Sequence, residues 1–338
     1  MKSQHITIKD IANELGFSIS TVSRALKNHP DINHDTKKRV QELAEHLHYT
    51  PNPIALSLKN RSSGIIGVIV PEVVHHFFAT VICGIEEVAE RNGYSLMLVQ
   101  SSEQLTKEVT AVTNIVSGRV DGVLASVSKQ TNSYGHFQKL IDTSIPLVFF
   151  DRVADTVDTM HVTVTDFAGA YEATKHLAEQ GCRNIVHFYG PQNRTIFQNR
   201  LNGYRQALED AGLPVLPHLI IEADSMDGGK RQTELLVRQG VAFDAIFAVN
   251  DFTAAGAMLA LKKAKLAIPQ DVAVVGFADE SITQMLEPNL SSVHQPGFEM
   301  GQQAMELLLK QINSDEKLPS EHIVLNTTMV VRESSLRR

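Results

Sequence analysis

The most constraining feature of this sequence is residues 6–26, where apolar residues recur at the spacing of two short amphipathic helices. Gly16 lies between the two patterns, and glycine readily adopts the left-handed conformation that ends a helix. Ser18 then stands where an N-cap for the second helix is expected. The residues predicted to face inward are Ile8, Ile11, Ala12, Leu15, Val22, Ala25 and Leu26. Helices joined this tightly predict either a simple helical hairpin or a helix-turn-helix, whose second helix enters the DNA major groove.

The order of residue types across residues 7–52 is more specific than the helical spacing. The positions that carry this signal are Thr7-Ile8, Asp10-Ile11-Ala12, Gly16, Ser18, Thr21-Val22-Ser23-Arg24, Asp31-Ile32, Thr36, Val40, Leu47 and Tyr49-Thr50-Pro51-Asn52. Together, and without a gap, they resemble the DNA-binding start of the lactose/galactose repressor (LacI–GalR) family. We therefore expect a helix-turn-helix domain over residues 1–50.

The resemblance implies which residues of this domain contact DNA. Ile19, Ser20 and Arg24 fall on the family's base-facing positions, whereas Thr21 and Ser23 lie nearer the DNA backbone. The other positions that the resemblance assigns to DNA are Thr7, Ser18 and Asn52.

Residues 51–63 form the predicted boundary between domains, because two prolines stop the preceding helix and polar residues follow. Residues 54–58 are long enough for little more than one helical turn, which is unstable alone in water. The resemblance implies a hinge helix that folds when two copies meet in the DNA minor groove, with Ala55 and Leu58 at the family's contact positions. Leu58 would act there as an apolar wedge between base steps. Leu56 departs from the family, in which a basic residue is common at that position.

The net charge of -7 is unevenly distributed along the 338 residues. Residues 1–60 contain eight Lys or Arg and six Asp or Glu, a net charge of +2, and the rest of the chain carries a net charge of -9. The run Lys37, Lys38 and Arg39 lies in a third predicted helix, about residues 34–48, and either contacts phosphates or forms a solvated helix face. A slightly basic start and an acidic body are compatible with a protein that binds DNA at one end only.

From residue 64 onward, short apolar runs alternate with amphipathic segments. The runs predicted to be strands are residues 65–70, 96–99, 122–127, 147–150, 185–188, 245–249 and 272–276. The segments predicted to be helices are residues 78–91, 107–116, 168–179, 201–210 and 253–263. This alternation predicts an α/β fold with parallel sheets that helices cover on both faces. The number of strands is too large for one comfortable sheet, so two similar lobes are expected.

The resemblance implies that this part has the two-lobed architecture of periplasmic sugar-binding proteins. The chain would cross between the lobes near residues 161, 291 and 326. The expected organisation is then a helix-turn-helix domain at residues 1–50, a hinge and linker at 51–63, and an effector-binding and dimerisation part at 64–338. The two lobes would comprise residues 64–160 with 292–325, and residues 161–291 with 326–338.

Ligands of open α/β sheets bind beyond the carboxyl ends of the strands, so the residues that follow each strand are candidates. Phe77 and Phe78 follow the first strand, and their rings either stack on a sugar or base or pack in the core. Asp151, Arg200 and Asn250 lie in segments that match the family pattern. By resemblance, these groups hydrogen-bond a polar ligand, as suits a polyol site. The alternative for Arg200 is a surface salt bridge.

One position of the expected site departs from the family. Ala278 stands where an Asp usually bonds the effector, and Asp279 follows it. Either Asp279 takes over this contact or the ligand lacks the usual hydroxyl. The neighbouring His75 and His76 raise the question of a metal, but adjacent residues seldom face one ion and no metal-binding spacing accompanies them. We therefore expect neither a metal nor a cofactor.

The sequence contains no motif typical of a serine hydrolase, a P-loop or a dinucleotide-binding enzyme, so we expect no enzymatic activity. The resemblance implies a repressor that binds a pseudo-palindromic operator as a homodimer, with a sugar-like effector between its lobes. No leucine heptad follows the C-terminal segment, which favours a dimer over a tetramer. The helix-turn-helix argues against a plain sugar-binding protein, whereas a regulator that responds to a partner protein stays open.

The expected location is the cytoplasm. Cys83 and Cys182 lack the spacing of a redox or metal motif and are predicted to be reduced and buried. The N-terminal residues lack the apolar core of a signal peptide, and no apolar run is long enough to span a membrane.

Overall fold

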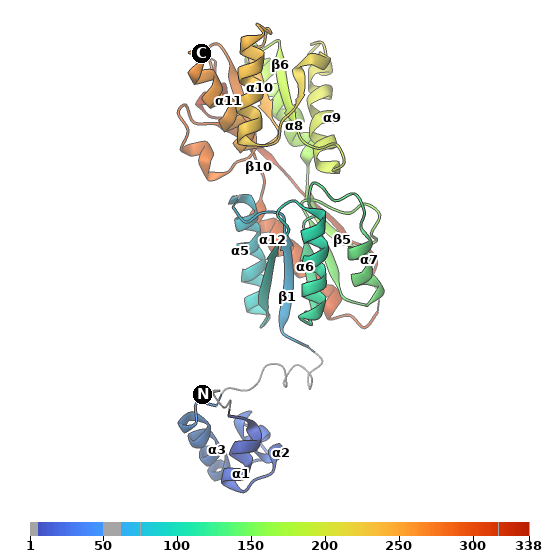
Figure 1. Ribbon diagram of the computed structural model, residues 1–338, viewed down its shortest axis with the longest axis vertical. Coiled ribbons are helices and arrows are strands. Elements are labelled where there is room, and N and C mark those ends of the chain that lie inside the picture. The colour runs from blue at the N-terminus through green and yellow to red at the C-terminus, as the bar shows by residue number, and fades with distance from the viewer. Residues whose placement is uncertain (1–5, 50–61, 75, 317, 338) are drawn as a thin grey trace. The chain divides into compact units, whose positions relative to one another are not determined.

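The computed structural model describes residues 6–49, 62–74, 76–316 and 318–337. By its internal contacts the chain divides into two units, Met1–Gly64 and Ile65–Arg338. The first unit is helical, and the second consists of two α/β lobes (Figure 1).

Three helices form the first unit around a small apolar core. They are α1 (Ile8–Leu15), α2 (Ile19–Leu26) and α3 (His34–His46). The buried residues of this core are Ile11, Ala12, Val22, Ala25, Val40 and Ala44. Ile8, Leu15 and Leu26, also predicted to face inward, are half-buried at its edge. The predicted helix-turn-helix and its apolar faces are confirmed.

Local capping explains where the two short helices begin and end. Asp10 accepts hydrogen bonds from the backbone N–H and the hydroxyl of Thr7, both at 2.7 Å, which stabilises the start of α1. These hydrogen bonds hold the pKa of Asp10 below its usual range. Gly16 ends α1 with φ 69°, a conformation that favours glycine even though a side chain there would meet nothing. Ser18 caps α2 by accepting the N–H of Thr21 at 3.1 Å, as predicted.

The second unit contains the predicted alternation of strands and helices. Its first part comprises β1 (Ile65–Val70), α5 (His76–Arg91), β2 (Ser95–Gln100), α6 (Leu105–Ser117), β3 (Gly122–Ala125), α7 (Gly135–Asp142), β4 (Leu147–Phe150) and β5 (Met160–Val164). Its middle part comprises α8 (Asp166–Glu179), β6 (Ile185–Tyr189), α9 (Thr195–Asp210), β7 (Ile220–Glu222), α10 (Met226–Arg238), β8 (Ala245–Ala248), α11 (Asp251–Lys263), β9 (Ala273–Ala278) and β10 (Ser291–His294). Its last part comprises α12 (Gly297–Ile312), β11 (His322–Leu325) and β12 (Thr328–Val330).

These strands form two sheets with matching topology. In the described residues the first lobe has the strand order β11-β5-β4-β3-β1-β2, and the second lobe has the order β12-β10-β9-β8-β6-β7. Every pairing is parallel except that of β12, which runs antiparallel to β10. The α/β fold with two lobes and parallel sheets is therefore confirmed.

At the first two of its three crossings the chain changes lobes slightly later than expected, and the third crossing lies where it was expected. Residue 161 lies inside β5, which pairs with β4 and β11 in the first sheet, so the first crossing follows Val164. Residue 291 begins β10, which pairs with β9 in the second sheet, so the second crossing follows His294. The third crossing lies between Leu325 and Thr328. At the first two crossings the chain leaves a lobe only after the strand before the crossing, β5 or β10, has paired with its neighbours.

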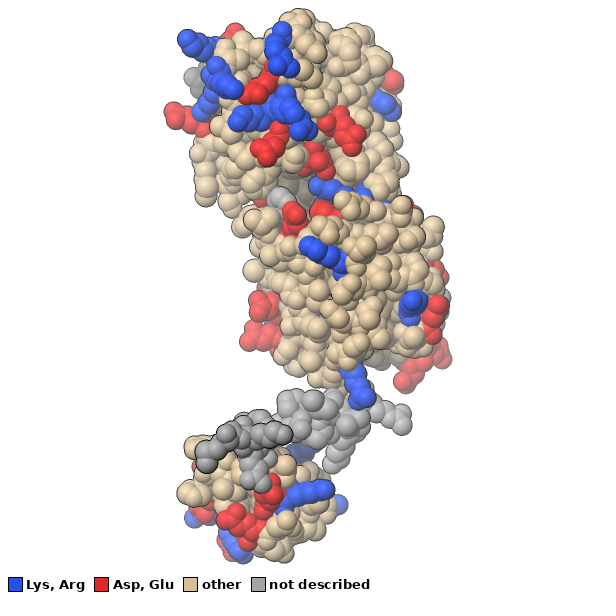
Figure 2. Space-filling view, in the orientation of Figure 1, with Lys and Arg blue, Asp and Glu red and all other residues tan. Residues whose placement is uncertain are grey.

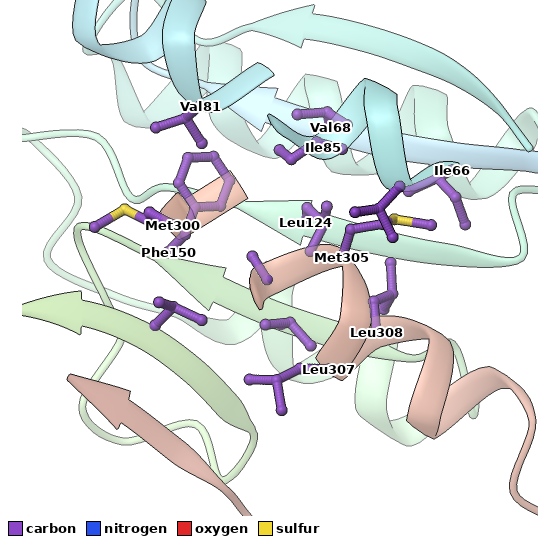
Figure 3. Packing of buried hydrophobic residues seen from close by; sticks show 14 of the residues in the cluster. Ile66, Val68, Val81, Ile85, Leu124, Phe150, Met300, Met305, Leu307 and Leu308 are labelled. Carbon is purple, nitrogen blue, oxygen red and sulfur yellow. The ribbon is translucent and has the colours of Figure 1, made fainter. Parts of the chain in front are cut away.

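Each sheet carries an apolar core on both faces. In the first lobe α5 and α12 cover one face, where Figure 3 shows Val81 and Ile85 opposite Met300 and Met305 above the strands. The two helices approach closely at glycines. A Cβ at Gly84 would lie 2.0 Å from the carbonyl oxygen of Phe298, and a Cβ at Gly301 would lie 2.0 Å from that of Val81. Only glycine permits this helix contact.

The structure can be compared with the predicted burial of the two cysteines and with the predicted absence of a membrane-spanning segment. Cys182 is buried, and burial raises the pKa of its thiol to about 11. The expectation that Cys83 is buried is wrong, because this residue is exposed on α5. Among the described residues no helix is long and apolar enough to cross a membrane.

Candidate functional site: nucleic-acid interface and ligand cleft

The outer face of α2 presents the residues predicted to meet DNA bases. Ile19 is 46% exposed, an unusual amount for a large apolar side chain in a folded unit. Ser20 and Arg24 are also exposed, whereas Thr21 and Ser23 are half-buried. The predicted base-facing residues are thus those that the fold leaves most accessible.

Hydroxyl groups cluster at the N-terminus of α2. The Oγ atom of Ser18 lies 2.8 Å from the Oγ atom of Ser20 and 2.8 Å from the Oγ1 atom of Thr21. Ser18 is therefore engaged in capping, as Thr7 is at the start of α1. Exposed hydroxyls at a helix N-terminus suit contact with a phosphate group, although these two also serve the local fold.

The basic run of α3 is partly engaged with its own unit. The Lys38 ammonium lies 3.9 Å from the Glu42 carboxylate, and the Arg39 guanidinium lies 5.3 Å from the ring centroid of Phe17. Lys37 is half-buried. The remaining predicted DNA contacts, Asn52, Ala55 and Leu58, lie outside the described residues, as does the departure at Leu56.

A cavity of about 380 Å³ lies within the second unit, lined by residues of both lobes. It opens where the strands present their carboxyl ends, as the general rule for α/β sheets requires. Phe77, Phe78, Asp151, Arg200 and Asn250 all line it, so the structure brings five of the six predicted ligand residues together. Acidic and basic side chains gather at this hollow (Figure 2).

Arg200 is buried and rigidly held. Its Nε and Nη2 atoms lie 2.8 Å from Oδ1 of Asp166, and its Nη1 atom donates to the Val249 carbonyl at 2.8 Å. Its guanidinium stacks 3.7 Å from the ring centroid of Phe277. Burial raises the pKa of Asp166 to about 6, even though the Arg200 guanidinium opposes that rise. Neither alternative considered for Arg200 describes it fully, because it forms a buried ion pair and also lines the cavity.

Asn250 has a structural role in addition to its place in the cavity wall. Its Oδ1 atom caps α11 by accepting the N–H of Thr253 at 2.8 Å. Its Nδ2 atom donates to the Asp224 carbonyl at 3.0 Å. The neighbouring Asp251 is turned away, accepting from Ser292 and from the N–H of Glu280, and burial raises its pKa to about 7.

Phe77 and Phe78 pack in the core and also border the cavity. Their exposed fractions are 9% and 3%, and both belong to the core beneath α5. Their rings meet edge to face with centroids 5.3 Å apart, and both line the cavity. The core therefore holds them in place at the cavity wall.

A charged network in the cavity was missed by the sequence reasoning. Glu103 accepts from Nη1 of Arg152 at 2.8 and 2.9 Å. Lys129 lies 2.8 Å from Asp224, which joins the two lobes across the cavity. Each of these residues follows a strand, so the rule applied to β1 and β4 would have found them if applied to β2, β3 and β7 as well.

The departure at Ala278 is a backbone feature as well as a change of side chain. Ala278 has φ 119° and Asp279 has φ 56°, which are unusual values for residues other than glycine. Asp279 is paired with Arg332 at 2.7 Å and lies 3.5 Å from His294. It lines a neighbouring cavity of about 300 Å³, whereas Ala278 lines the main one. Asp279, the sixth predicted ligand residue, is therefore not brought to the main cavity with the other five.

Candidate metal ligands are few. No group of three or more His, Cys, Asp or Glu side chains within the described residues is arranged to hold a metal ion. His75 lies outside those residues, so the question raised by the His75 and His76 pair is not answered by this finding.

Known proteins resemble the chain over nearly its whole length. The family described as bacterial regulatory proteins, lacI family, matches residues 7–52, and a periplasmic binding protein-like domain matches residues 174–335. The ribose operon repressor of Halalkalibacterium halodurans is 32% identical over 97% of both chains. The solved complex of the transcriptional regulator CelR with cellobiose is 27% identical, covers 97% of this chain and 99% of its own, and has a TM-score of 0.74.

A third comparison concerns the fold. The lac repressor dimer, solved with operator and the anti-inducer ONPF, is 24% identical, with a TM-score of 0.87 over 99% of this chain and all of its own. The relatives are transcriptional regulators and not enzymes, which confirms the prediction that the chain is no enzyme. Coverage and identity over the whole chain show that it belongs to the lacI family of bacterial regulatory proteins.

Proposed function

We propose that the chain is a dimeric transcriptional repressor of the bacterial cytoplasm that binds a pseudo-palindromic operator. Its DNA affinity would be controlled by a small, polar, sugar-like molecule bound between the two lobes. The observation that carries the first part is the face of α2, whose Ile19, Ser20 and Arg24 are exposed without any role in the core. A helix with such a face, second in a helix-turn-helix, suits the DNA major groove.

The ligand part of the proposal is supported by the chemistry of the cleft. Aromatic rings and many polar and charged side chains line the cleft together, a composition that suits a small polar ligand with one apolar face. Among the relatives, one is named for ribose and one was solved with cellobiose. We infer that Asp151, Arg200 and Asn250 orient a ligand whose apolar face rests on Phe77 or Phe78.

Control of DNA binding requires the ligand to favour one arrangement of the lobes. A ligand with equal affinity for both arrangements would shift nothing. The lobes are joined by Lys129 to Asp224 at 2.8 Å and by Asn193 to the Lys129 carbonyl at 2.8 Å, so a ligand that favours another arrangement of the lobes would have to break these bonds.

The dimer is supported by an apolar surface on the first lobe. Leu98 of β2 and Val109 and Val116 of α6 are between 38% and 45% exposed, and β2 is the edge strand of its sheet. Figure 2 shows few charged side chains over α6. Exposed apolar residues of this kind suit contact with a second copy.

The test is to select DNA from a random library with the full-length protein. We expect enrichment of one pseudo-palindromic site, and sedimentation of the complex as two chains per site. Fluorescence anisotropy of the selected DNA, repeated with individual sugars, then measures the effect of a ligand. Recovery of unrelated sequences, or of a site bound by one chain, would overturn the proposal.

A further inference from the structure

Glu108 is a charged residue on the apolar inner face of α6. Its side chain is fully buried, on the same face of the helix as Ala111, Val112 and Ile115. Burying a carboxylate destabilises a fold unless hydrogen bonds replace the water that it loses. Glu108 lines neither the main cavity nor its neighbour, so contact with a ligand there does not explain its position.

Three donors bind this carboxylate, and all three lie within residues 128–136. Oε2 of Glu108 accepts the backbone N–H of Ser128 at 2.6 Å. Oε1 accepts the hydroxyl of Thr131 at 2.7 Å and lies 2.9 Å from Nε2 of His136. Burial alone would raise the pKa of this carboxylate, but the hydrogen bonds from His136, Ser128 and Thr131 outweigh burial and hold the pKa below its usual range. The carboxylate is therefore ionised at neutral pH and bound on both oxygens.

These donors hold a loop that has no regular structure of its own. The loop of residues 126–134 joins the end of β3 to the start of α7. Within it the N–H of Thr131 donates to the Ser128 carbonyl at 3.2 Å, and the Oγ atom of Ser128 lies 2.6 Å from that of Ser101. Ser101, Ser128 and Thr131 are all fully buried. A buried polar cluster around Glu108 thus fixes one side of the loop.

The other side of the same loop contacts the second lobe. The Lys129 ammonium lies 2.8 Å from the Asp224 carboxylate, and the Lys129 carbonyl accepts from Asn193 at 2.8 Å. The Tyr134 hydroxyl accepts from Nη1 of Arg194 at 2.9 Å. Three bonds between the lobes therefore end on a loop whose place in the first lobe depends on the buried carboxylate.

The two oxygens of Glu108 differ in how easily they can be replaced. The N–H of Ser128 can only donate, so it requires an acceptor at the position of Oε2. The hydroxyl of Thr131 and the ring of His136 can donate or accept, so they tolerate either kind of group at the position of Oε1. Glutamine can therefore still hold the backbone of the loop, whereas an apolar side chain of the same length would leave a buried N–H unpaired.

We propose that Glu108 is a positioning residue for the arrangement of the two lobes, because it holds the loop of residues 126–134 where Lys129 and Tyr134 meet the second lobe. The inference rests on the proposed function only for its last consequence, that a change in lobe arrangement alters DNA affinity. It goes beyond that function by assigning control of the lobes to a residue outside the helical unit and outside the wall of the main cavity.

The direct test measures the distance between labels on the two lobes of the full-length protein. The labels are attached at Glu306→Cys of α12 and Glu209→Cys of α9, both exposed positions. The exposed Cys83 is replaced by serine, and Cys182 reacts slowly because burial raises the pKa of its thiol to about 11. Labelled chains are diluted with unlabelled ones, so that few assemblies contain two labelled copies.

Glu108→Met keeps the length of the side chain and removes both acceptors. The reference is a bond-deleted chain that carries Lys129→Met, Tyr134→Phe and Asn193→Ala and so lacks the three bonds between the lobes. We expect Glu108→Met to shift the mean label distance in the same direction as the bond-deleted chain and by at least half as much. Glu108→Gln should restore most of the wild-type distance, since its amide oxygen can accept the N–H of Ser128.

The matched control is Asp244→Leu. Asp244 accepts the backbone N–H groups of Arg183 and Asn184 at 2.8 and 2.9 Å, so it holds a segment of the second lobe that bears none of the three bonds. Glu108→Met and Asp244→Leu should both lower the melting temperature, but only Glu108→Met should shift the label distance. An equal shift in both variants, or none in Glu108→Met, would overturn the proposal.

A combined variant separates positioning from general weakening of the lobe. If Glu108 acts through the loop, Glu108→Met should shift the label distance no further in the bond-deleted chain. A further shift as large as that in the wild type would mean that Glu108 acts by another route, and the proposal would be rejected. Should Glu108→Met fail to fold, Thr131→Val removes one donor to Oε1 and takes its place; an unchanged label distance in that variant also rejects the proposal.

Operator affinity is measured separately, by anisotropy with the selected DNA. We expect Glu108→Met to change it by about two- to thirtyfold, the range for residues that alter coupling without touching a ligand. A shifted label distance with unchanged operator affinity would support the role of Glu108 and reject control of DNA binding by the lobes. An unchanged label distance rejects the role of Glu108, whatever the operator affinity.

Discussion

The predicted functional residues of the helical unit and those of the cleft differ in how much of the fold depends on them. On α2, Ile19, Ser20 and Arg24 are exposed, and the core of that unit forms without them. In the cleft, Arg200 holds a buried carboxylate and Asn250 caps a helix. A DNA surface can therefore be altered with the fold intact, whereas a cleft built from structural residues links ligand binding to stability.

The largest expected effect tests whether the fold depends on the cleft residue Arg200. Arg200→Met leaves the Asp166 carboxylate buried without its partner, which should lower the free energy of unfolding by about 3–5 kcal/mol. Urea unfolding of the second unit measures this change. The double variant Arg200→Met with Asp166→Asn removes both charges and should recover part of the loss. Equal losses in the single and double variants would show that the ion pair is not what stabilises this region.

A smaller effect is expected at the DNA surface. Arg24→Ala should remove about 1–3 kcal/mol of discrimination between operator variants, because an arginine can donate two hydrogen bonds to one guanine. The melting temperature should stay at the wild-type value, since Arg24 is exposed. Anisotropy with matched and mismatched operators measures the discrimination. Lys37→Ala is the control, and it should weaken binding to all DNAs alike. Loss of affinity without loss of discrimination would place Arg24 on the phosphate backbone.

The buried carboxylate of Asp251 gives the second unit a pH dependence of stability. Burial raises its pKa from 3.8 in the unfolded chain to about 7, so the folded state binds more protons between these values. The contribution of Asp251 to stability is therefore present below pH 4 and is lost as the pH rises through 7. The difference in melting temperature between wild type and Asp251→Asn should then be larger at pH 5 than at pH 8. A constant difference would show that the carboxylate does not titrate in this range.

The smallest effect concerns the bond between the lobes. Lys129→Met and Asp224→Asn should each change stability by about 1 kcal/mol or less, because the pair is only partly buried. Their effect on the distance between labels on the two lobes should be larger, and it should increase at low salt. The pair Lys263 and Glu234, 2.9 Å apart within the second lobe, is the control. An unchanged label distance would remove this bond from the account of lobe closure.

The sequence predicted the strands with continuous apolar runs but missed several elements with other patterns. Residues 226–238 contain Gly228 and Gly229, which disfavour a helix in isolation. The structure nevertheless forms α10 there, and the helix packs closely against α11. Glycine is needed for this packing, because a Cβ at Gly229 would lie 2.1 Å from the Thr253 carbonyl oxygen of α11. Residues 160–164 alternate polar and apolar side chains and lie where a lobe crossing was expected, and they form β5 between two neighbours.

A site residue was predictable where it directly follows a strand. It was not predictable where its burial and its ion pairs depend on residues far away in the sequence. Position after a strand pointed to Asp151 and Asn250. The pairing of Arg200 with Asp166 joins residues from two helices, and no local pattern reveals it.

The measurement that tests the account most directly is the affinity of the full-length protein for its selected operator, with and without a compound that raises the melting temperature of the second unit. The account predicts that this compound changes the operator dissociation constant by about fivefold or more, and that operator DNA changes the affinity for the compound by the same factor. An operator affinity that is identical at zero and at saturating compound would contradict it.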